Sequence, residues 1–161
     1  MAESGQLIGH KNSTGDAAVD GLFGGVLAGI GMAAYLVLAS LMLEGGPGAM
    51  FSRFDPGQEA APLNGLLVHL AVSGVYGVVF GIGYQAIAGR KREARTARQA
   101  IVSGAVYGLA LMLLAWLVLL PGAGSALVEM PVAHFATGHL IYGAILGVML
   151  YRSRMNSGPS R

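Results

Sequence analysis

Four long apolar stretches that lack any charged residue set the main constraint on this chain. They cover residues 22–42, 63–88, 101–120 and 132–151, and none contains Asp, Glu, Lys or Arg. A helix needs about 20 apolar residues to cross the hydrocarbon core of a bilayer, so each stretch is long enough. Helices of a water-soluble bundle would carry polar outer faces, which these stretches lack. We therefore expect an all-α integral membrane four-helix bundle.

The composition and the tails agree with a membrane protein. Hydrophobic residues make up 54% of the chain and charged residues 11%, whereas a soluble domain has about 25% charged residues. The polar start lacks the basic and apolar regions of a signal peptide, so the first helix is expected to act as the insertion signal. We expect a polar tail (1–20), one transmembrane domain (21–152) and a second polar tail (153–161).

The basic residues are distributed unevenly along the chain. Five of the ten Lys and Arg residues fall within 90–98, and two more follow the last helix at 152 and 154. The loops expected on the opposite side hold one basic residue, Arg53. Cytoplasmic loops carry such an excess, so both termini and the 89–99 loop are expected in the cytoplasm. Topology explains the basic charge, which argues against a nucleic-acid partner and for contact with the lipid bilayer.

Each expected helix carries small residues spaced four apart. Residues at this spacing share one helix face, and small residues let helix backbones approach closely in lipid. We expect these faces to pack against a neighbouring helix, against another membrane subunit, or against the flat ring of a pigment or haem. The expected packing residues are Gly25, Gly29, Gly77, Gly81, Gly104, Gly108, Gly143 and Gly147.

The two halves of the chain resemble each other. Tyr76–Gly77 in the second helix corresponds to Tyr142–Gly143 in the fourth, and each outward loop contains a Pro–Gly step followed by a further proline. The pattern predicts two tandem helical hairpins, about 21–88 and 100–152, as a parallel repeat. Glycine-rich membrane helices also resemble each other by chance, so both interpretations stay open.

The spans contain few groups that carry chemistry. Asp and Glu are absent from all four spans, whereas pumps and coupled transporters usually place ionisable groups at membrane depth. No catalytic triad, paired carboxylate or phosphate loop is recognisable. The chain also has no cysteine, which excludes disulfides and thiolate metal sites. We expect a protein that is not an enzyme.

His69 and His139 are the strongest candidate site residues. Each lies on the glycine row of its helix, and the two are expected within about one helical turn of the same depth. The simpler interpretation is that they make structural hydrogen bonds, with no cofactor bound. The alternative is a haem b iron held between them, or contact with a quinone or pigment. His134 is five residues from His139, a spacing that points the two rings apart and argues against a zinc site. His139 is therefore expected to matter more than His134.

Aromatic residues near the ends of the spans have a simpler expected role. Tyr35 and Tyr84 fit anchoring at the membrane interface. In the loop between the first two helices, Met50, Phe51 and Phe54 are expected to dip into the interface or to dock on a partner.

The first helix is of a GxxAG type, and the last opens with His139–x–x–Tyr142–Gly143–x–x–x–Gly147. This combination resembles uncharacterised small four-helix membrane proteins of bacteria and archaea, over residues 21–151. The resemblance implies a multi-pass protein of the prokaryotic plasma (inner) membrane and assigns no catalytic residue.

These observations lead to three hypotheses about function. The leading one is a non-catalytic integral membrane subunit of a larger energy-transducing assembly, such as a respiratory or photosynthetic electron-transfer complex, with other membrane subunits as partners. The alternative is a small b-type cytochrome or quinone-interacting membrane anchor that uses His69 and His139. The third is a passive pore or small-solute carrier.

Overall fold

The computed structural model describes residues 13–42, 46–55, 57, 61–90, 96–123 and 126–156. Four of its helical segments are long and apolar enough to cross a membrane, Thr14–Met42, Pro62–Ile87, Ala97–Leu119 and Val132–Asn156. No strand occurs in the described part of the chain. The all-helical fold and the four apolar helices agree with the sequence-based prediction.

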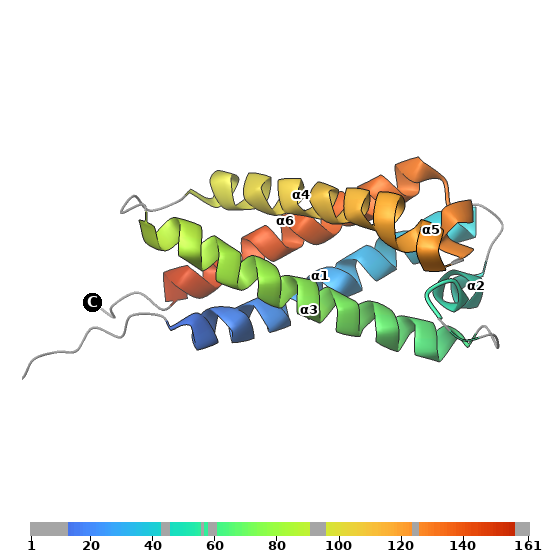
Figure 1. The fold of residues 1–161 in the computed structure, drawn as a ribbon, viewed down its shortest axis with the longest axis horizontal. Coiled ribbons are helices and arrows are strands. Elements are labelled where there is room, and N and C mark those ends of the chain that lie inside the picture. Colours follow the sequence, from blue (N-terminus) through green and yellow to red (C-terminus); the bar gives the residue numbers. More distant parts are fainter. Residues whose placement is uncertain are drawn as a thin grey trace, which may run out of the picture.

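The elements follow one another as α1 (Thr14–Met42), α2 (Pro47–Ser52), α3 (Pro62–Arg90), α4 (Ala97–Leu114), a π-helical segment (Ala115–Leu119), α5 (Leu120–Ala123), a 3₁₀ turn (Ala126–Glu129) and α6 (Val132–Asn156). The four long helices run side by side in an elongated bundle (Figure 1). α2 and α5 lie at one end, which we call the α2 end. The beginning of α1 and the end of α6 lie at the other, which we call the Asp20 end.

Two helices begin earlier than the apolar stretches predict. α1 starts at Thr14, inside the segment expected to be a polar tail, because Ser13 and Asp16 cap it reciprocally through their side chains and backbone N–H groups at 3.1 and 2.8 Å. α4 starts at Ala97 behind a capping box formed by Thr96 and Gln99. Caps satisfy the free N–H groups of a first turn, so each helix extends beyond its apolar span. At the other terminus, α6 continues to Asn156.

The third span changes its helical geometry near its end. Residues Ala115–Leu119 form a π-helical segment, in which the N–H of Leu120 bonds to the carbonyl of Ala115. Pro121 follows directly and lacks the N–H that an α-helix would direct to the carbonyl of Leu117. The wider turn accommodates this missing bond, and the helical path continues through Pro121 to Ala123 instead of stopping at residue 120 as expected.

α1 and α3 approach each other at the level of their backbones. A Cβ atom added to Gly77 would lie 2.6 Å from the Cα of Gly25, and one added to Gly25 would lie 2.8 Å from the Cα of Gly77. An added Cβ would come within 2.6 Å of Ser73 at Gly29 and within 3.0 Å of a Cα of α1 at Gly81. A side chain at any of these four glycines would therefore collide with the opposite helix.

α4 and α6 form a second contact of the same kind. A Cβ added to Gly108 would lie 3.3 Å from the Cα of Gly143, and one added to Gly104 would lie 3.0 Å from the backbone nitrogen of Gly147. Added atoms at Gly143 and Gly147 would each come within 3.1 Å of a Cα of α4. All eight glycines singled out in the sequence therefore lie at these two helix contacts.

The contact between α1 and α6 is different, because side chains fill it. The space beside Gly138 on α6 is taken by the tips of Met32 and Leu36, whose nearest atoms lie 3.3 and 3.4 Å from the position of an added Cβ. Beside Gly24 on α1, the tip of Leu146 lies at 3.2 Å. Leu36 and Leu146 are almost completely buried, so this seam forms the apolar centre of the bundle.

α2 packs onto the beginning of α3. Gly65 allows this contact, because a Cβ there would meet the backbone of Phe51 and would lie 3.1 Å from the nitrogen of Asp55. Met50 is buried, and the ring of Phe54 lies 4.8 Å from the ring of His69. Met50 therefore packs inside this chain, which corrects the expectation that it reaches into the interface or onto a partner. Phe51 and Phe54 are half-buried, so for them the expectation stays a prediction.

Candidate functional site

His69 lies on α3 and makes a hydrogen bond to α1. Its Nε2–H donates to the carbonyl of Gly29 at 3.0 Å, and the side chain is buried. Because Gly29 has no side chain, α1 can lie directly against Ser73 of α3. His69 therefore connects two helices, and the nitrogen that would bind a haem iron is already occupied.

His139 lies on α6 and bonds within its own helix. Its Nδ1–H donates to the carbonyl of Phe135 at 2.8 Å, and its ring lies 4.5 Å from the Phe135 ring. It lies close enough to His69 for the two rings to interact electrostatically. The glycine rows of the two helices nevertheless face different partners, since that of α3 meets α1 and that of α6 meets α4. A haem between the two histidines would require at least His69 to leave its carbonyl.

Two tyrosine hydroxyls hold α3 to the second pair of long helices. Tyr142 on α6 donates to the carbonyl of Ser73 at 2.6 Å, and Tyr107 on α4 donates to the carbonyl of Tyr76 at 2.8 Å. A buried tyrosine hydroxyl needs such a partner. Phe80 packs against the Tyr107 ring at 4.8 Å, so an aromatic layer lies between α3 and α4.

His134 has a specific partner that the sequence did not indicate. Its Nδ1 and the hydroxyl of Tyr35 are hydrogen-bonded at 2.9 Å, which joins α6 to α1 near the α2 end. Tyr35 was expected to be an interfacial anchor. No periodic pattern in the sequence relates these two residues, because they are far apart in the chain and meet only when α1 packs on α6. The expectation that His134 matters less than His139 has no support in these contacts.

A cavity of about 290 Å³ opens beside His134 at the α2 end. We call it the α2-end cavity. It is lined by α1, α2 and the residues that lead into α6, and its polar lining includes Arg53 and Glu129, which are 3.8 Å apart. Its apolar lining includes the buried side chains of Met50 and Met130.

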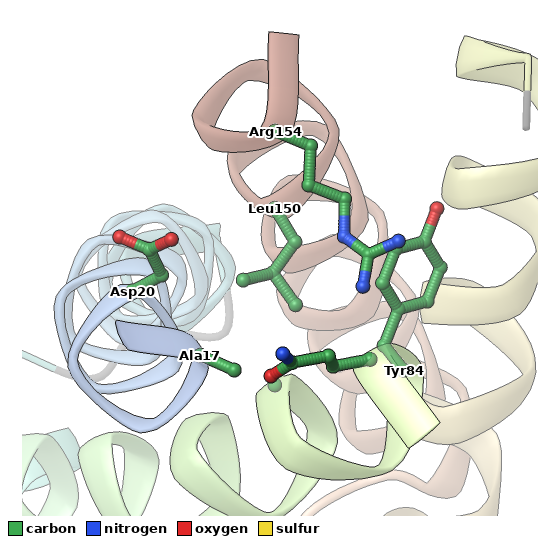
Figure 2. A pocket seen from close by; sticks show the side chains of 7 residues that line it. Ala17, Asp20, Tyr84, Leu150 and Arg154 are labelled. Carbon is green, nitrogen blue, oxygen red and sulfur yellow. The ribbon is translucent and has the colours of Figure 1, made fainter. Parts of the chain in front are cut away.

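A much smaller cavity, about 20 Å³, lies at the Asp20 end between α1, α3 and α6. Figure 2 shows Leu150 between Asp20 and Arg154, with the Arg154 guanidinium over the ring of Tyr84 at 4.7 Å. Asp20 accepts a hydrogen bond from Ser153. Tyr84 is buried beneath the arginine. This corrects the expectation that it anchors at the membrane interface. A cavity of this size suits one water molecule.

The described residues contain no group of three or more His, Cys, Asp or Glu side chains that could hold a metal ion. Comparison with family models, curated proteins and solved structures found no match.

Proposed function

We propose that the chain is a non-catalytic integral membrane subunit whose helices pack against each other and against partner subunits. The polar side chains inside the spans carry this proposal, because they bond to neighbouring helices. His69, Tyr107 and Tyr142 each donate to a backbone carbonyl of another helix. Groups that could carry proton transfer or bind a ligand are thereby engaged in holding the bundle together.

The exposed surface of α4 supports association with other membrane proteins. Only 17% of the most apolar part of the third span is buried within this chain, against 44% for α1. Its exposed side chains include the apolar Val102, Val106, Leu113 and Leu117. The glycines of α4 face α6, so the bare side is bulky and suits side-chain packing with a partner helix.

Site-specific photo-crosslinking in native membranes tests this role. A benzophenone amino acid at Val106, on the bare side of α4, should give a discrete crosslinked protein band. The same probe at Phe23 on α1, which is equally exposed at 66% against 62% for Val106, serves as the matched control. Adducts to lipid alone at Val106, together with a monodisperse chain that purifies without any other protein, would contradict the subunit proposal.

We also propose how the helices are paired and on which side of the membrane the loops and termini lie. The backbone-level contacts of α1 with α3 and of α4 with α6 support two tandem helical hairpins. The excess of basic residues at 90–98 supports a cytoplasmic position for that loop and for both termini, in a prokaryotic plasma membrane. Residues 1–12, 91–95 and 157–161 lie outside the described residues. The type of assembly, a respiratory or photosynthetic electron-transfer complex, stays a prediction from the sequence.

A small-solute carrier is the second candidate, and a specific observation favours it. The two cavities lie at opposite ends of the bundle, and both are lined by α1 and α6. The seam between these two helices is filled by flexible side chains such as Met32 and Leu36. Uptake of a solute by proteoliposomes that contain only this chain would favour the carrier over the subunit.

A further inference from the structure

The α2-end cavity has the size and the lining of a site for a small ligand. Its volume of about 290 Å³ is close to the lower end of the range for ligand pockets, roughly 300–1,000 Å³. Leu36, Ala39, Met50 and Met130 give it an apolar floor, and all four are buried. Such pockets typically combine an apolar lining with a few polar groups that orient the ligand.

Among the residues that the structure describes, the charged lining of this cavity consists of one loosely held pair. Arg53 Nη2 lies 3.8 Å from Glu129 Oε2, and the two side chains are 35% and 70% exposed. An exposed pair of this kind contributes little to stability, so a ligand can separate it at little cost. Arg53 comes from the loop after α2 and Glu129 from the 3₁₀ turn before α6, so the pair joins two loops beside the cavity.

From this geometry we propose that the α2-end cavity binds a zwitterionic amphiphile, a small apolar body that carries an anionic and a cationic group close together. A ligand with a single charge would leave either Glu129 or Arg53 without its partner. A zwitterion exchanges partners instead, because its anionic group binds Arg53 and its cationic group binds Glu129. Its apolar body then covers the floor formed by Met50 and Met130.

This chemistry has two sources, a free zwitterion such as an apolar amino acid or the headgroup of a zwitterionic lipid. The site is independent of the proposed subunit role. Its lining includes neither the exposed face of α4 nor any residue of a partner protein.

Binding to the purified full-length chain tests the proposal. For the free ligand, calorimetry in mild detergent compares leucine with 4-methylpentanoate, which lacks the ammonium group, and with 3-methylbutylamine, which lacks the carboxylate. For the lipid, native mass spectrometry compares retained phosphatidylethanolamine with phosphatidylglycerol. We expect leucine to bind at least tenfold more tightly than both analogues, or phosphatidylethanolamine to be retained in preference to phosphatidylglycerol. Either result supports the site and shows whether its ligand is a free zwitterion or a lipid.

Variants separate the site from general effects on the protein. Arg53→Gln and Glu129→Gln should each weaken binding at least tenfold, and the exchange of both residues (R53E with E129R) should restore it, since both charges are present again. Ala49→Trp fills the cavity from an exposed position on α2 and should abolish binding with both charges in place. Arg152→Gln, an exposed arginine on α6 near the Asp20 end, should bind like the parent.

Three results would overturn the proposal. The first is an analogue that binds as tightly as leucine while phosphatidylglycerol is retained as well as phosphatidylethanolamine. The second is binding that survives Ala49→Trp. The third is a parent protein that binds neither leucine nor phosphatidylethanolamine.

Discussion

At the scale of single residues, buried and half-buried polar side chains act as links between helices. His69 joins α3 to α1, Tyr142 joins α6 to α3, and His134 with Tyr35 joins α6 to α1. Each bond directs a side chain to a specific atom on another helix. In lipid, where apolar surface gives no preference among helices, such bonds and close packing select the partners.

Replacing His69 by phenylalanine should weaken the bundle. The ring keeps its approximate shape and its contact with Phe54, but the bond to the Gly29 carbonyl is lost. We expect the free energy of unfolding in detergent to fall by about 1 kcal/mol, in the range for membrane hydrogen bonds. Thr137→Val is the control, because the Thr137 hydroxyl bonds a carbonyl of its own helix, that of Ala133. Equal stability of both variants would show that the His69 bond contributes nothing.

A reduced-minus-oxidised absorption spectrum of the purified chain tests the cytochrome alternative. We expect no Soret band, because His69 Nε2 is bonded to Gly29 and the two histidine rows face different helices. A band in the parent protein that disappears in both His69→Ala and His139→Ala would establish the cytochrome and refute our interpretation of these histidines.

At the scale of the helices, the glycines divide into two groups with different neighbours. The packing glycines of α1 with α3 and of α4 with α6 meet backbone atoms, except Gly29, which meets the Ser73 side chain, while those of the α1–α6 seam meet the tips of side chains. Backbone atoms cannot move aside, whereas a methionine or leucine tip can change its rotamer. The α1–α3 and α4–α6 contacts are therefore the least tolerant of added volume.

Alanine substitutions at two glycines of α3 should have different effects on stability. At Gly77 the new methyl group would lie 2.6 Å from the Cα of Gly25, while at Gly83 no atom lies within 4 Å. Overpacking costs about 1–3 kcal/mol, whereas alanine is favoured over glycine in a helix by up to about 1 kcal/mol. We expect Gly77→Ala to lower the unfolding midpoint and Gly83→Ala to keep or raise it. If Gly77→Ala were as stable as Gly83→Ala, the close contact of α1 with α3 would be refuted.

At the scale of the whole molecule, the bundle has two chemically different ends. The Asp20 end carries Asp20 with Ser153 and Arg154 over Tyr84, and the α2 end carries Arg53, Glu129 and the larger cavity. If the bundle spans a bilayer in the proposed orientation, these ends face the cytoplasm and the exterior respectively.

Cysteine labelling in intact cells tests this orientation, and the absence of native cysteine makes each introduced thiol unique. Ala97→Cys at the start of α4 should resist an impermeant maleimide, while Ala49→Cys on α2 should react. Both positions are exposed, so burial does not account for a difference. After permeabilisation both should react equally. The reverse pattern in intact cells would invert the topology.

The sequence by itself determined the helical class, the number of long apolar helices and which residues are small enough for close contact. These properties are local, because hydropathy depends on a single stretch and a glycine lacks a side chain wherever it packs. It also gave α3 correctly to within a few residues, since Pro62 marks its beginning. The apolar pattern alone did not predict where α1 and α4 begin, because capping side chains extend these helices beyond their apolar stretches.

Only the tertiary structure decided which surfaces meet. The four glycine rows are nearly equivalent in sequence. Only the way the helices pack shows that the row of α1 meets that of α3 and the row of α4 meets that of α6. That pairing brings Gly29 to His69, and the packing of α1 on α6 brings Tyr35 to His134. The close approach of α2 to α3 at Gly65 also decides where Met50 lies, at the lining of the α2-end cavity. Such contacts join residues that are distant in the chain, so no local pattern encodes them.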